Sequence, residues 1–500
     1  MNTVEKWGLF EVSLKGPSAG NPFTEQSVSA TFRSKNEIVT VGGFYDGDGV
    51  YKVRFMPSFT GDYVYETVGS FPEAESAGDF TVTEPTGNNH GPVRIANTYH
   101  FAYEDTTPYY SVGTTCYAWA HQPEEVHKQT LEELDKGYFN KMRFCVFPKH
   151  YIHNFRDPET FPYEGTPVDN SNLTEENFSY SVDFSGNNWD FTRFNPEHFR
   201  RMERCIVELQ ERGIEADIIV MHPYDRWGFS DMNREQDDLY WNYVIARFSA
   251  YRNVWWSLAN EYDLMRAKKL EDWEHYADLL CKKDPYNHMR SIHNCIPFYD
   301  HTRPWITHCS LQRQDLYRHV EYTTDYRTRY QKPIVWDEIA YEGNIDMGWG
   351  NISGQELTRR FWEASMRGGY AGHGETFMNP EDILWWSHGG KLHGESPARI
   401  RFLHEILTQT PGLGLKQGPG AFDETVAVPD EMIPVTGYEI HYYGFGRPSF
   451  RNFVKPAGEN WRVEVIDTWN MTITEAGVHS GKFRIALPGH EYMAVRLTRV

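Results

Sequence analysis

The sequence predicts an α/β protein: a (β/α)₈ TIM barrel flanked by an N-terminal immunoglobulin-like β-sandwich and a small C-terminal β-sandwich. Three observations lead to this fold. Strand and helix patterns alternate from about residue 93 to 410, short strands precede that region, and β-rich segments follow it. The chain has 500 residues, which is too long for one ordinary hydrophobic core. We expect three domains, at residues 1–92, 93–412 and 413–500.

The N-terminal region reads as all-β. Short stretches of strand character, such as residues 52–55 and 63–67, are separated by turn signals. The Asp-Gly-Asp-Gly run at 46–49 is one such signal, and Thr-Gly-Asp at 60–62 is another. Short strands at even spacing are typical of an immunoglobulin-like sandwich. The Gly-, Asn- and Pro-containing stretch at 86–92 is the expected linker into the barrel.

The central region repeats a strand followed, in most cases, by a helix. The predicted strands are 109–115, 141–147, 216–222, 254–259, 289–293, 305–311, 333–338 and 370–376. One predicted helix, 196–212, opens behind Asn195 with Pro196 in its first position, and another covers 355–367. Eight such repeats fit a TIM barrel with long loops. A doubly wound sheet is the alternative, but no Gly-rich phosphate loop follows any of these strands.

The C-terminal region turns β-rich again after about residue 420. Residues 438–443 and 461–466 alternate or run apolar at strand length, which predicts a second small sandwich. Sandwich domains often mediate association, so a homo-oligomer is among the partners that we consider.

Net charge limits the class of partner. The chain carries 49 basic and 70 acidic residues, and 49 − 70 gives −21. Such a balance argues against binding to nucleic acid or to an anionic membrane. No run of 18 apolar residues predicts a transmembrane helix. The start lacks the basic and apolar regions of a signal peptide, which favours a cytoplasmic location, although a secreted protein that has lost its signal peptide would look the same.

Cysteine usage indicates free thiols. The six cysteines form no Cys-x-x-Cys pair, and several lie in apolar runs, as buried thiols of a reducing compartment do. Zinc ligation lacks its usual spacing. We therefore expect no metal and no cofactor.

Two glutamates carry the functional prediction. The apolar run 254–259 ends in Asn260-Glu261, and the run 333–336 ends in Asp337-Glu338. Catalytic groups of a TIM barrel come from the C-terminal ends of its strands, here the fourth and the seventh. A lone Glu after a strand more often caps a helix or pairs with an Arg. The pair, each behind an apolar strand, favours catalysis.

The pair matches the needs of retaining glycoside hydrolysis. One carboxylic acid protonates the leaving oxygen, and a carboxylate about 5–5.5 Å away attacks the anomeric carbon. Asn260 is placed to hydrogen-bond the 2-hydroxyl of the sugar, a bond that strengthens in the transition state. Asp337 precedes Glu338 on its strand, so by alternation it should face the other way.

The two strand ends resemble the acid/base and nucleophile strands of clan A, the large superfamily of retaining (β/α)₈ glycosidases. The resemblance implies Glu261 as acid/base and Glu338 as nucleophile, and it covers about residues 93–410. The motifs at 7–12, 43–45 and 53–55 resemble the sandwich that precedes such barrels in bacterial polysaccharide-degrading enzymes. The three-part layout resembles the apiosidase-like group of glycosidases. Apiosidases place Gly-Asp where Asn260-Glu261 stands here, so the resemblance implies a retaining mechanism but not apiose specificity.

Further residues at predicted strand ends are candidates for substrate binding. Arg143 on the second strand would orient the nucleophile, as an Arg there commonly does in this clan, by a charge-assisted hydrogen bond. His222 and His308, which we take to end the third and sixth strands, should line the pocket. The loops at strand ends should supply its walls, and an aromatic pair after the eighth strand would form a sugar platform. The remaining substrate-binding candidates are Trp119, His121, His150, His293, Glu375 and Trp385.

The functional prediction is a retaining hydrolase that cleaves a β-linked, plant-polysaccharide-derived glycosidic bond from the chain end, with an oligosaccharide or glycoside as its partner. A transglycosylase would use the same residues. A catalytically silent carbohydrate-binding protein should lack one of the two glutamates, and neither is replaced. A metal-dependent hydrolase should carry His-x-His after the first strand, where this sequence has Thr114-Thr115-Cys116.

Overall fold

The computed structural model describes residues 2–153, 156–313, 315, 318–380, 384–431 and 436–500. The chain forms two compact units. The first comprises residues 1–93, 117–131 and 143–293, and the second comprises 94–116, 132–142 and 294–500. The strands of the central barrel are shared between the two units.

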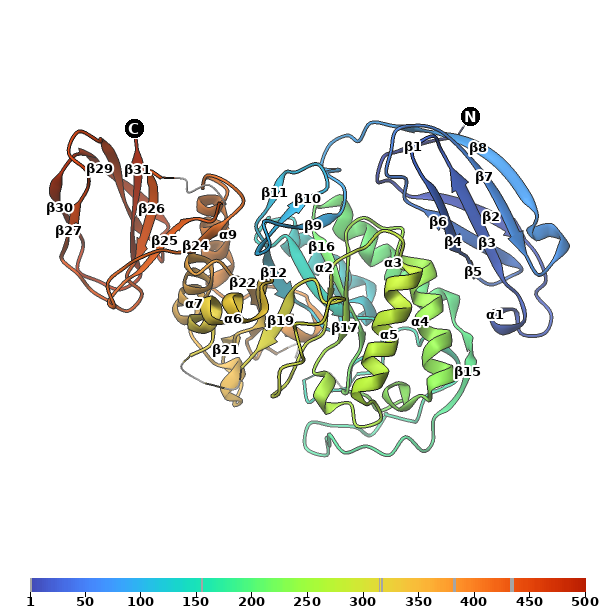
Figure 1. Cartoon of the computed structure of the whole chain (residues 1–500). Coiled ribbons are helices and arrows are strands. Elements are labelled where there is room, and N and C mark those ends of the chain that lie inside the picture. The colour runs from blue at the N-terminus through green and yellow to red at the C-terminus, as the bar shows by residue number, and fades with distance from the viewer. Residues whose placement is uncertain (1, 154–155, 314, 316–317, 381–383, 432–435) are drawn as a thin grey trace. The chain divides into compact units, whose positions relative to one another are not determined.

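The N-terminal region is a two-sheet sandwich (Figure 1). One sheet has the order β1-β8-β7-β3-β4 and the other the order β2-β6-β5. The strands are β1 (Asn2–Glu5), β2 (Phe10–Lys15), β3 (Val28–Arg33), β4 (Ile38–Gly42), β5 (Phe44–Tyr45), β6 (Val50–Phe55), β7 (Gly61–Gly69) and β8 (Ser76–Thr83), and the short helix α1 covers Pro22–Glu25. The predicted N-terminal sandwich is confirmed.

Stacked aromatic rings fill the core of this sandwich. Strand β2 alternates buried and more exposed residues, as a strand with one face on a core must. The rings of Phe10 and Phe80 stack with centroids 3.8 Å apart, and those of Phe32 and Phe55 with centroids 4.3 Å apart. Aromatic residues make up 15% of the chain, and core packing of this kind accounts for part of them.

Within the first unit, a buried ion-pair network ties the sandwich to two helices. Arg54 of β6 donates from Nη1 to Oε1 of Glu203 at 2.7 Å, and Arg247 donates from Nε to the same oxygen at 2.5 Å. Arg247 also binds Asp46. Burial alone would raise the pKa of Glu203, but the guanidinium groups of Arg247 and Arg54 hold it below the usual value. The sandwich is therefore fixed to the helices by paired charges.

The central region is a parallel, nearly closed eight-stranded barrel. Its strand order is β18-β17-β16-β13-β12-β22-β20-β19. The strands are β12 (Val112–Thr115), β13 (Lys141–Cys145), β16 (Glu215–Met221), β17 (Val254–Ala259), β18 (Arg290–Ser291), β19 (Cys309–Gln312), β20 (Ile334–Glu338) and β22 (Tyr370–His373). In chain order they are strands one to eight, which confirms the predicted TIM barrel.

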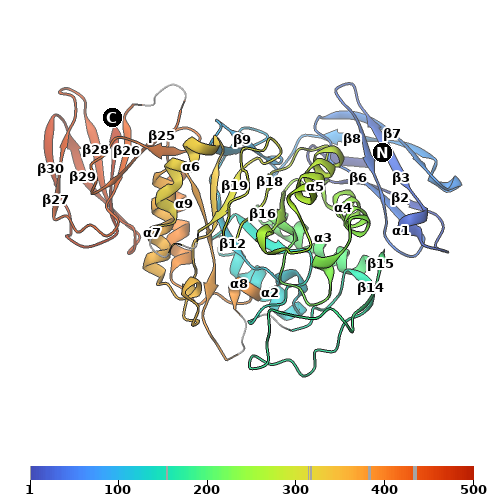
Figure 2. The ribbon, with the colours of Figure 1, turned by 60° about the horizontal axis from the view of Figure 1, so that its bottom comes forward.

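Helices follow most of these strands. They are α2 (Glu124–Leu134), α3 (Pro196–Glu211), α4 (Arg234–Phe248), α5 (Leu270–Lys283), α6 (Thr323–Tyr330), α7 (Gly354–Met366), α8 (Trp385–His388) and α9 (Ser396–Leu407). Helix α3 starts as predicted, with Pro196 first and Asn195 accepting from the amide of Glu197. Helices α3, α4 and α5 stand side by side (Figures 1 and 2). Residues 292–308, all described, hold turns but no helix.

The sixth strand differs from its prediction. We expected strand structure over 305–311, but β19 covers only Cys309–Gln312, and 304–305 form a turn. His308 therefore precedes the strand, at its amino end. The apolar character of Trp305 and Ile306 misled the prediction because a short apolar run does not distinguish a strand from a packed turn.

Several short elements decorate the barrel. A three-stranded sheet comprises β9 (Val93–Ala96), β10 (His100–Tyr103) and β11 (Pro108–Tyr109). Strands β14 (Tyr163–Thr166) and β15 (Asn188–Phe194) pair in the long loop after β13. Beyond β20 and β22, the short strands β21 (Glu342–Gly343) and β23 (Glu375–Thr376) pair in parallel.

The C-terminal region is a second sandwich, as predicted. One sheet has the order β24-β25-β26-β31-β28-β29, and β27 pairs with β30 in the other. The strands are β24 (Leu415–Gln417), β25 (Thr425–Pro429), β26 (Tyr438–Tyr442), β27 (Phe450–Val454), β28 (Trp461–Asp467), β29 (Thr472–His479), β30 (Lys482–Ala486) and β31 (Met493–Arg499). Its core includes Trp461, Val463, Ile485 and Leu497.

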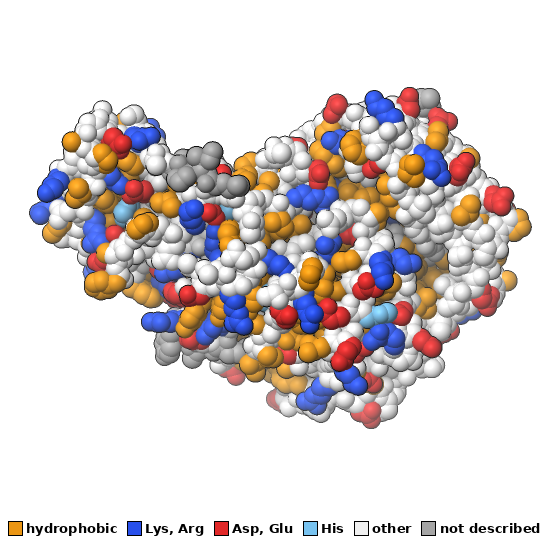
Figure 3. All heavy atoms as spheres, viewed as in Figure 1, with side chains coloured by type: hydrophobic (Ala, Val, Ile, Leu, Met, Phe, Trp, Pro, Cys, Tyr) orange, Lys and Arg blue, Asp and Glu red, His pale blue; other side chains and the backbone are white. Residues whose placement is uncertain are grey.

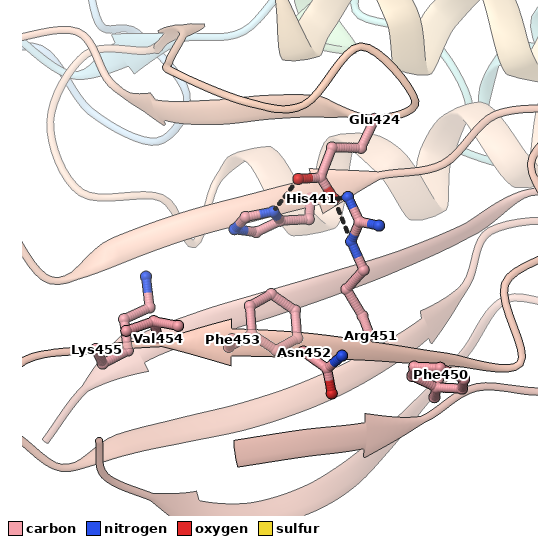
Figure 4. Close-up of a pocket in the computed structure, with 8 residues that line it drawn as sticks. All are labelled: Glu424, His441, Phe450, Arg451, Asn452, Phe453, Val454 and Lys455. Carbon is pink, nitrogen blue, oxygen red and sulfur yellow. Dashed lines mark hydrogen bonds and ion pairs between the residues drawn. The ribbon is translucent and has the colours of Figure 1, made fainter. Parts of the chain in front are cut away.

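A buried histidine connects two carboxylates in this sandwich, and Figure 4 shows one of them, Glu424. Nδ1 of His441 lies 3.5 Å from Oε1 of Glu424, and its Nε2 lies 3.0 Å from Oε2 of Glu439. Burial alone would lower the pKa of His441, but the two carboxylates raise it above the usual value. Bonds from His441 and from Arg451 or Lys455 outweigh burial and lower the pKa of Glu424 and of Glu439 to about 2.

Acidic and basic side chains are interspersed on the face drawn in Figure 3. Among the described residues, no helix is long and apolar enough to cross a membrane. The domain boundaries after residues 92 and 412 stay a prediction, as they fall in segments between β8 and β9 and between α9 and β24.

Candidate active site

Glu261 follows the fourth strand in an unusual backbone conformation. Strand β17 ends at Ala259, and Glu261 has φ 51° and ψ 57°, the left-handed region. A non-glycine residue there is strained, and such strain gathers at functional sites. The amide of the next residue, Tyr262, donates to the carbonyl of His293 after β18, which holds the turn. His293, a predicted wall residue, is fully buried and acts here through its backbone.

Three tyrosines and a lysine form a cluster at neighbouring strand ends, and one of the tyrosines binds Glu261. The hydroxyl of Tyr224 donates to Oε2 of Glu261. Nζ of the buried Lys149 lies 3.4 Å from the ring centroid of Tyr117 and 4.5 Å from that of Tyr224, with Tyr151 at 5.1 Å. Cation–π attraction of this kind holds the rings in place. Sequence reasoning did not single out the tyrosines, and only their places just after strands one to three could have indicated them.

Asn260 is oriented by two donors. Its Oδ1 accepts from the hydroxyl of Tyr117 at 3.3 Å and from Nη2 of Arg143 at 3.4 Å. Arg143 lies on β13, is buried, and also has Nε 3.7 Å from Oδ2 of Asp217 on β16. Since both donors use the amide oxygen, the NH₂ group of Asn260 is turned away from them and is available to donate to a sugar hydroxyl.

Three buried histidines bind three consecutive carbonyls at the end of β13. His121, His198 and His222 lie with Nε2 3.0, 3.0 and 3.1 Å from the carbonyl oxygens of residues 145, 146 and 147. Burial lowers the pKa of His222 to about 3, so it is neutral at ordinary pH. A neutral ring that donates from Nε2 keeps Nδ1 as an acceptor. His222 follows β16, as predicted.

His121 does not fit its prediction as a pocket wall. Its ring stacks on that of His198 in helix α3, with centroids 5.3 Å apart and planes 12° apart. It is buried and packs in the layer between the end of β13 and the helix, because the short 3-10 turn after the first strand directs it there.

A pocket of about 570 Å³ opens beside Glu261 within the first unit. Tyr224, which binds Glu261, is among its lining residues, together with His150, whose role in substrate binding stays a prediction. The ring of His150 lies tilted against that of Phe178, with centroids 4.7 Å apart. Its Nε2 lies 3.3 Å from the carbonyl oxygen of Ser179, and burial lowers its pKa to about 4. Residues 263–267, after Glu261, form another wall.

Glu338 ends the seventh strand, at an irregularity in the sheet. Ser310 of β19 pairs with Val335, and Gln312 with Glu338, so β20 has one more residue than its neighbour over this stretch. Bulges of this kind are frequent beside active sites, where they change the direction of a side chain. Gln312, which ends the sixth strand, pairs with Glu338, and the misplaced strand prediction did not single it out.

Asp337 corrects the expectation from strand alternation. It accepts from Nζ of Lys141 at 2.7 Å and from Oγ of Ser310 at 2.5 Å. Lys141 lies on β13, and two strands, β12 and β22, separate it from β20 in the sheet order. Their side chains can meet only inside the barrel, so Asp337 faces the barrel interior and not the outer layer.

His308 is wrong as a pocket residue. It precedes β19 and packs against Phe101 of β10, with ring centroids 5.9 Å apart. The amino ends of barrel strands lie at the end of the barrel opposite the catalytic face. The prediction failed because the strand begins four residues later than expected.

The predictions of Trp119 as a wall residue of the site and of Trp385 as part of a sugar platform are also wrong. Trp119 has an exposed fraction of 0% and stacks on His127 of helix α2, with centroids 4.5 Å apart. Trp385 has an exposed fraction of 1% and donates from its indole to Oγ1 of Thr114 at 2.8 Å. Thr114 alternates with Gly113, which faces the interior residue Lys141, so Trp385 lies outside the strands. A platform needs an open ring face.

A different aromatic cluster lies in the loops after the seventh and eighth strands. Trp349 is partly exposed, and its ring centroid lies 5.1 Å from that of Trp386 and 5.8 Å from that of Tyr341. Sequence reasoning noted the 385–386 pair but considered only its first member a site residue, because neighbouring residues in a helix face different ways.

Glu375 lies beyond the eighth strand with both oxygens bound. They accept from the backbone amides of His393 at 2.5 Å and Gly394 at 2.8 Å. Glu375 thus holds the loop that contains His393 and Gly394. Burial raises the pKa of Glu375 to about 8, so its carboxyl group is protonated near neutral pH. Glu342 caps α9 nearby by accepting from the amides of Glu395 and Ser396.

Among the residues that the structure describes, no group of three or more His, Cys, Asp or Glu side chains could hold a metal ion.

Three family models match the chain. The model of the apiosidase-like catalytic domain matches residues 96–389. Two domains of unknown function flank it, DUF5060 at residues 3–70 and DUF5605 at residues 430–498. No curated protein matches the chain.

Solved structures are also similar. A candidate glycoside hydrolase from Bacteroides vulgatus ATCC 8482 is 34% identical, with a TM-score of 0.92 and coverage of 100% of both chains. A glycoside hydrolase family 5 protein from the same organism is 13% identical, with a TM-score of 0.61 over 82% of this chain and 93% of its own. At that identity the second likeness concerns the fold alone.

Proposed function

The chain belongs to the apiosidase-like family and is a glycoside hydrolase of that type, and from this premise we propose that it cleaves its substrate by double displacement, with Glu261 as acid/base and Glu338 as nucleophile. The observation that carries the proposal is the position of the two glutamates. They stand at the carboxyl ends of the fourth and seventh strands of one parallel barrel, where the catalytic groups of such barrels lie.

The proposed reaction has two steps. In the first, the Glu338 carboxylate attacks the anomeric carbon while the bond to the leaving oxygen breaks and Glu261 gives that oxygen its proton. In the second, Glu261 takes a proton from water, whose oxygen attacks the anomeric carbon and releases Glu338. Two inversions give net retention. The mechanism requires the two carboxyl groups to lie about 5–5.5 Å apart.

The neighbours of Glu261 support this assignment. The hydroxyl of Tyr224 binds one carboxylate oxygen of Glu261 and so restricts the direction of the proposed proton donor. Asn260 is oriented by Tyr117 and Arg143, so its NH₂ group would donate to the 2-hydroxyl of the sugar. His222, neutral and fixed in its tautomer, would accept from a further hydroxyl. We keep Arg143 as the residue that orients Glu338, and Trp349 replaces Trp385 as the proposed sugar platform.

We propose a β-linked substrate derived from plant polysaccharide and attack at its chain end. Screening the protein against aryl β-glycosides and plant oligosaccharides identifies the sugar. A transglycosylase would pass the glycosyl group to an added alcohol in preference to water. A silent binding protein would bind oligosaccharides without turning any over.

Three variants test the roles of the carboxylates. Glu338→Gln should form no glycosyl-enzyme with any substrate. Glu261→Gln should lose least with an activated aryl leaving group and should accumulate the intermediate, because the second step lacks its base. Azide should restore Glu261→Ala with retained configuration. Glu271→Gln, an exposed glutamate on α5, is the matched control. Near wild-type rates for all variants would overturn the proposal.

A further inference from the structure

The pocket of about 570 Å³ lies next to Glu261, the proposed acid/base. Tyr224 lines it and binds Glu261, and the segment that begins directly after Glu261 forms one of its walls. In double displacement the acid protonates the leaving oxygen, so the leaving group lies against the acid and away from the nucleophile. The following argument rests on the proposed function.

Exposed apolar side chains form much of the pocket wall. Tyr180 has an exposed fraction of 53% and Leu264 one of 40%. The partly exposed Phe184 and the buried Met265 line the same space. Large apolar side chains that stay open to solvent around a hollow mark binding surfaces. Such walls fit a flat or ring-shaped group with an apolar face.

The charged side chains that line the pocket are mainly acidic, and two cations lie next to lining residues: Lys149 has Nζ 4.5 Å from the ring centroid of Tyr224, and Arg226 acts on His150. The lining includes the carboxylates Asp225, Asp231 and Asp263 and a single guanidinium, Arg266. Asp225 is held by the backbone amides of Trp227 and Ser230. His150, the remaining titratable wall residue that could become cationic, has a pKa lowered to about 4 by burial, so it is neutral at pH 7. An anionic group in the pocket would be repelled.

We infer that this pocket binds the leaving group of the substrate, and that the leaving group is uncharged and presents an apolar ring face, as a neutral sugar or an aryl alcohol does. A uronic acid in the same place is disfavoured. The pocket thus sets specificity for the half of the substrate that departs first, while the sugar that reacts is bound elsewhere in the site.

Two donors of the same sugar separate this role from catalysis. A glycosyl fluoride has a leaving group too small to reach the pocket, whereas the matching aryl glycoside and neutral disaccharide fill it. Leu264→Ala should lower kcat/KM about tenfold for the filled donors and leave the fluoride within about twofold. Leu270→Ala, the same change at an exposed leucine on α5 outside the pocket, should alter neither.

A second comparison of substrates tests whether the pocket disfavours a charged leaving group. A disaccharide with a uronic acid as the leaving group should react at least about tenfold more slowly than its neutral counterpart, and Asp263→Asn should narrow the gap. A larger loss with the disaccharide than with the aryl donor would identify a sugar as the natural leaving group, and the reverse would identify a phenol.

The failures can be told apart. If the fluoride loses as much rate as the filled donors in Leu264→Ala, or if both leucine variants behave alike, the pocket does not bind the leaving group. If the uronic acid donor reacts as fast as the neutral one, the charge claim is wrong. If no fluoride, aryl glycoside or disaccharide is turned over by the wild type, the proposed function itself falls, and this inference falls with it.

Discussion

The hydroxyl of Tyr224 donates a hydrogen bond to Oε2 of Glu261, and the ring of Tyr224 lies 4.5 Å from Nζ of Lys149. Tyr224 comes from the loop after the third strand, and Glu261 from the loop after the fourth. A carboxylate whose backbone is in the left-handed region is therefore also fixed at its side chain. For an acid that must meet one oxygen atom, this restriction reduces the reorganisation needed in the transition state.

Tyr224→Phe should impair proton donation by Glu261. A hydrogen bond to a charged group contributes about 1.5–3 kcal/mol, so kcat/KM should fall about 10- to 100-fold with poor leaving groups and less with activated aryl groups. Because the bond favours the ionised carboxylate, its loss should move the alkaline limb of the pH profile to higher pH. Tyr138→Phe, away from the pocket lining, is the control. Equal losses for good and poor leaving groups would contradict the positioning role.

Trp349→Ala and Trp385→Phe should affect different properties. Trp349 is partly exposed, and removing a stacking ring should raise KM about tenfold, since such aromatic contacts contribute about 0.5–1.5 kcal/mol beyond area burial. Trp385 is buried and donates to Thr114, so Trp385→Phe should lower the melting temperature and leave KM unchanged. Steady-state kinetics and thermal melting, measured on both variants, check the pair. A raised KM in Trp385→Phe alone would reinstate the original platform.

Arg54→Ala should destabilise the junction between the N-terminal sandwich and the helices. Glu203 has a side-chain exposed fraction of 9%, and removing one partner of a buried pair costs about 3–5 kcal/mol. Arg94→Ala removes an exposed pair with Glu104, which contributes about 0–1 kcal/mol. Urea unfolding of both variants measures the difference. Similar midpoints for the two would mean that the network adds nothing to stability.

The stability of the C-terminal sandwich should depend on pH through His441. Its folded pKa is raised, so its contribution is full below the unfolded value of about 6.5 and is lost as the pH rises through the folded pKa. Glu424 and Glu439, with pKa values lowered to about 2, contribute above about pH 4.5 and lose their effect as the pH falls toward 2. Stability should be greatest between these limits.

Hydrogen exchange in strands β26 and β28 measures this profile. His441→Gln should remove the loss of stability on the alkaline side. The control is His479→Gln in the same sandwich, where the histidine bonds to the backbone carbonyl of Ala476 instead of a carboxylate. This variant should keep the alkaline loss of stability. An unchanged decline in His441→Gln would assign the dependence to another group.

The sequence by itself determined the order of strands and helices, the two flanking sandwiches and the placing of Glu261 and Glu338 at strand ends. These features are local, since periodicity and capping by Asn195 and Pro196 act within a few residues. The position of Asn260 directly before Glu261 needed no tertiary contact to be recognised.

Only the tertiary structure decided which aromatic and polar groups belong to the site. Trp119 and Trp385 pack outside the strands, and His308 lies at the wrong end of its strand. Tyr224, which binds Glu261, and Lys149, which lies against the ring of Tyr224, come from other strand ends. The physical reason is twofold. The period of a strand sets which faces its residues alternate between, but it does not reveal a bulge such as that in β20. The burial of a residue depends on which distant segments pack on it, and its neighbours in sequence do not encode that.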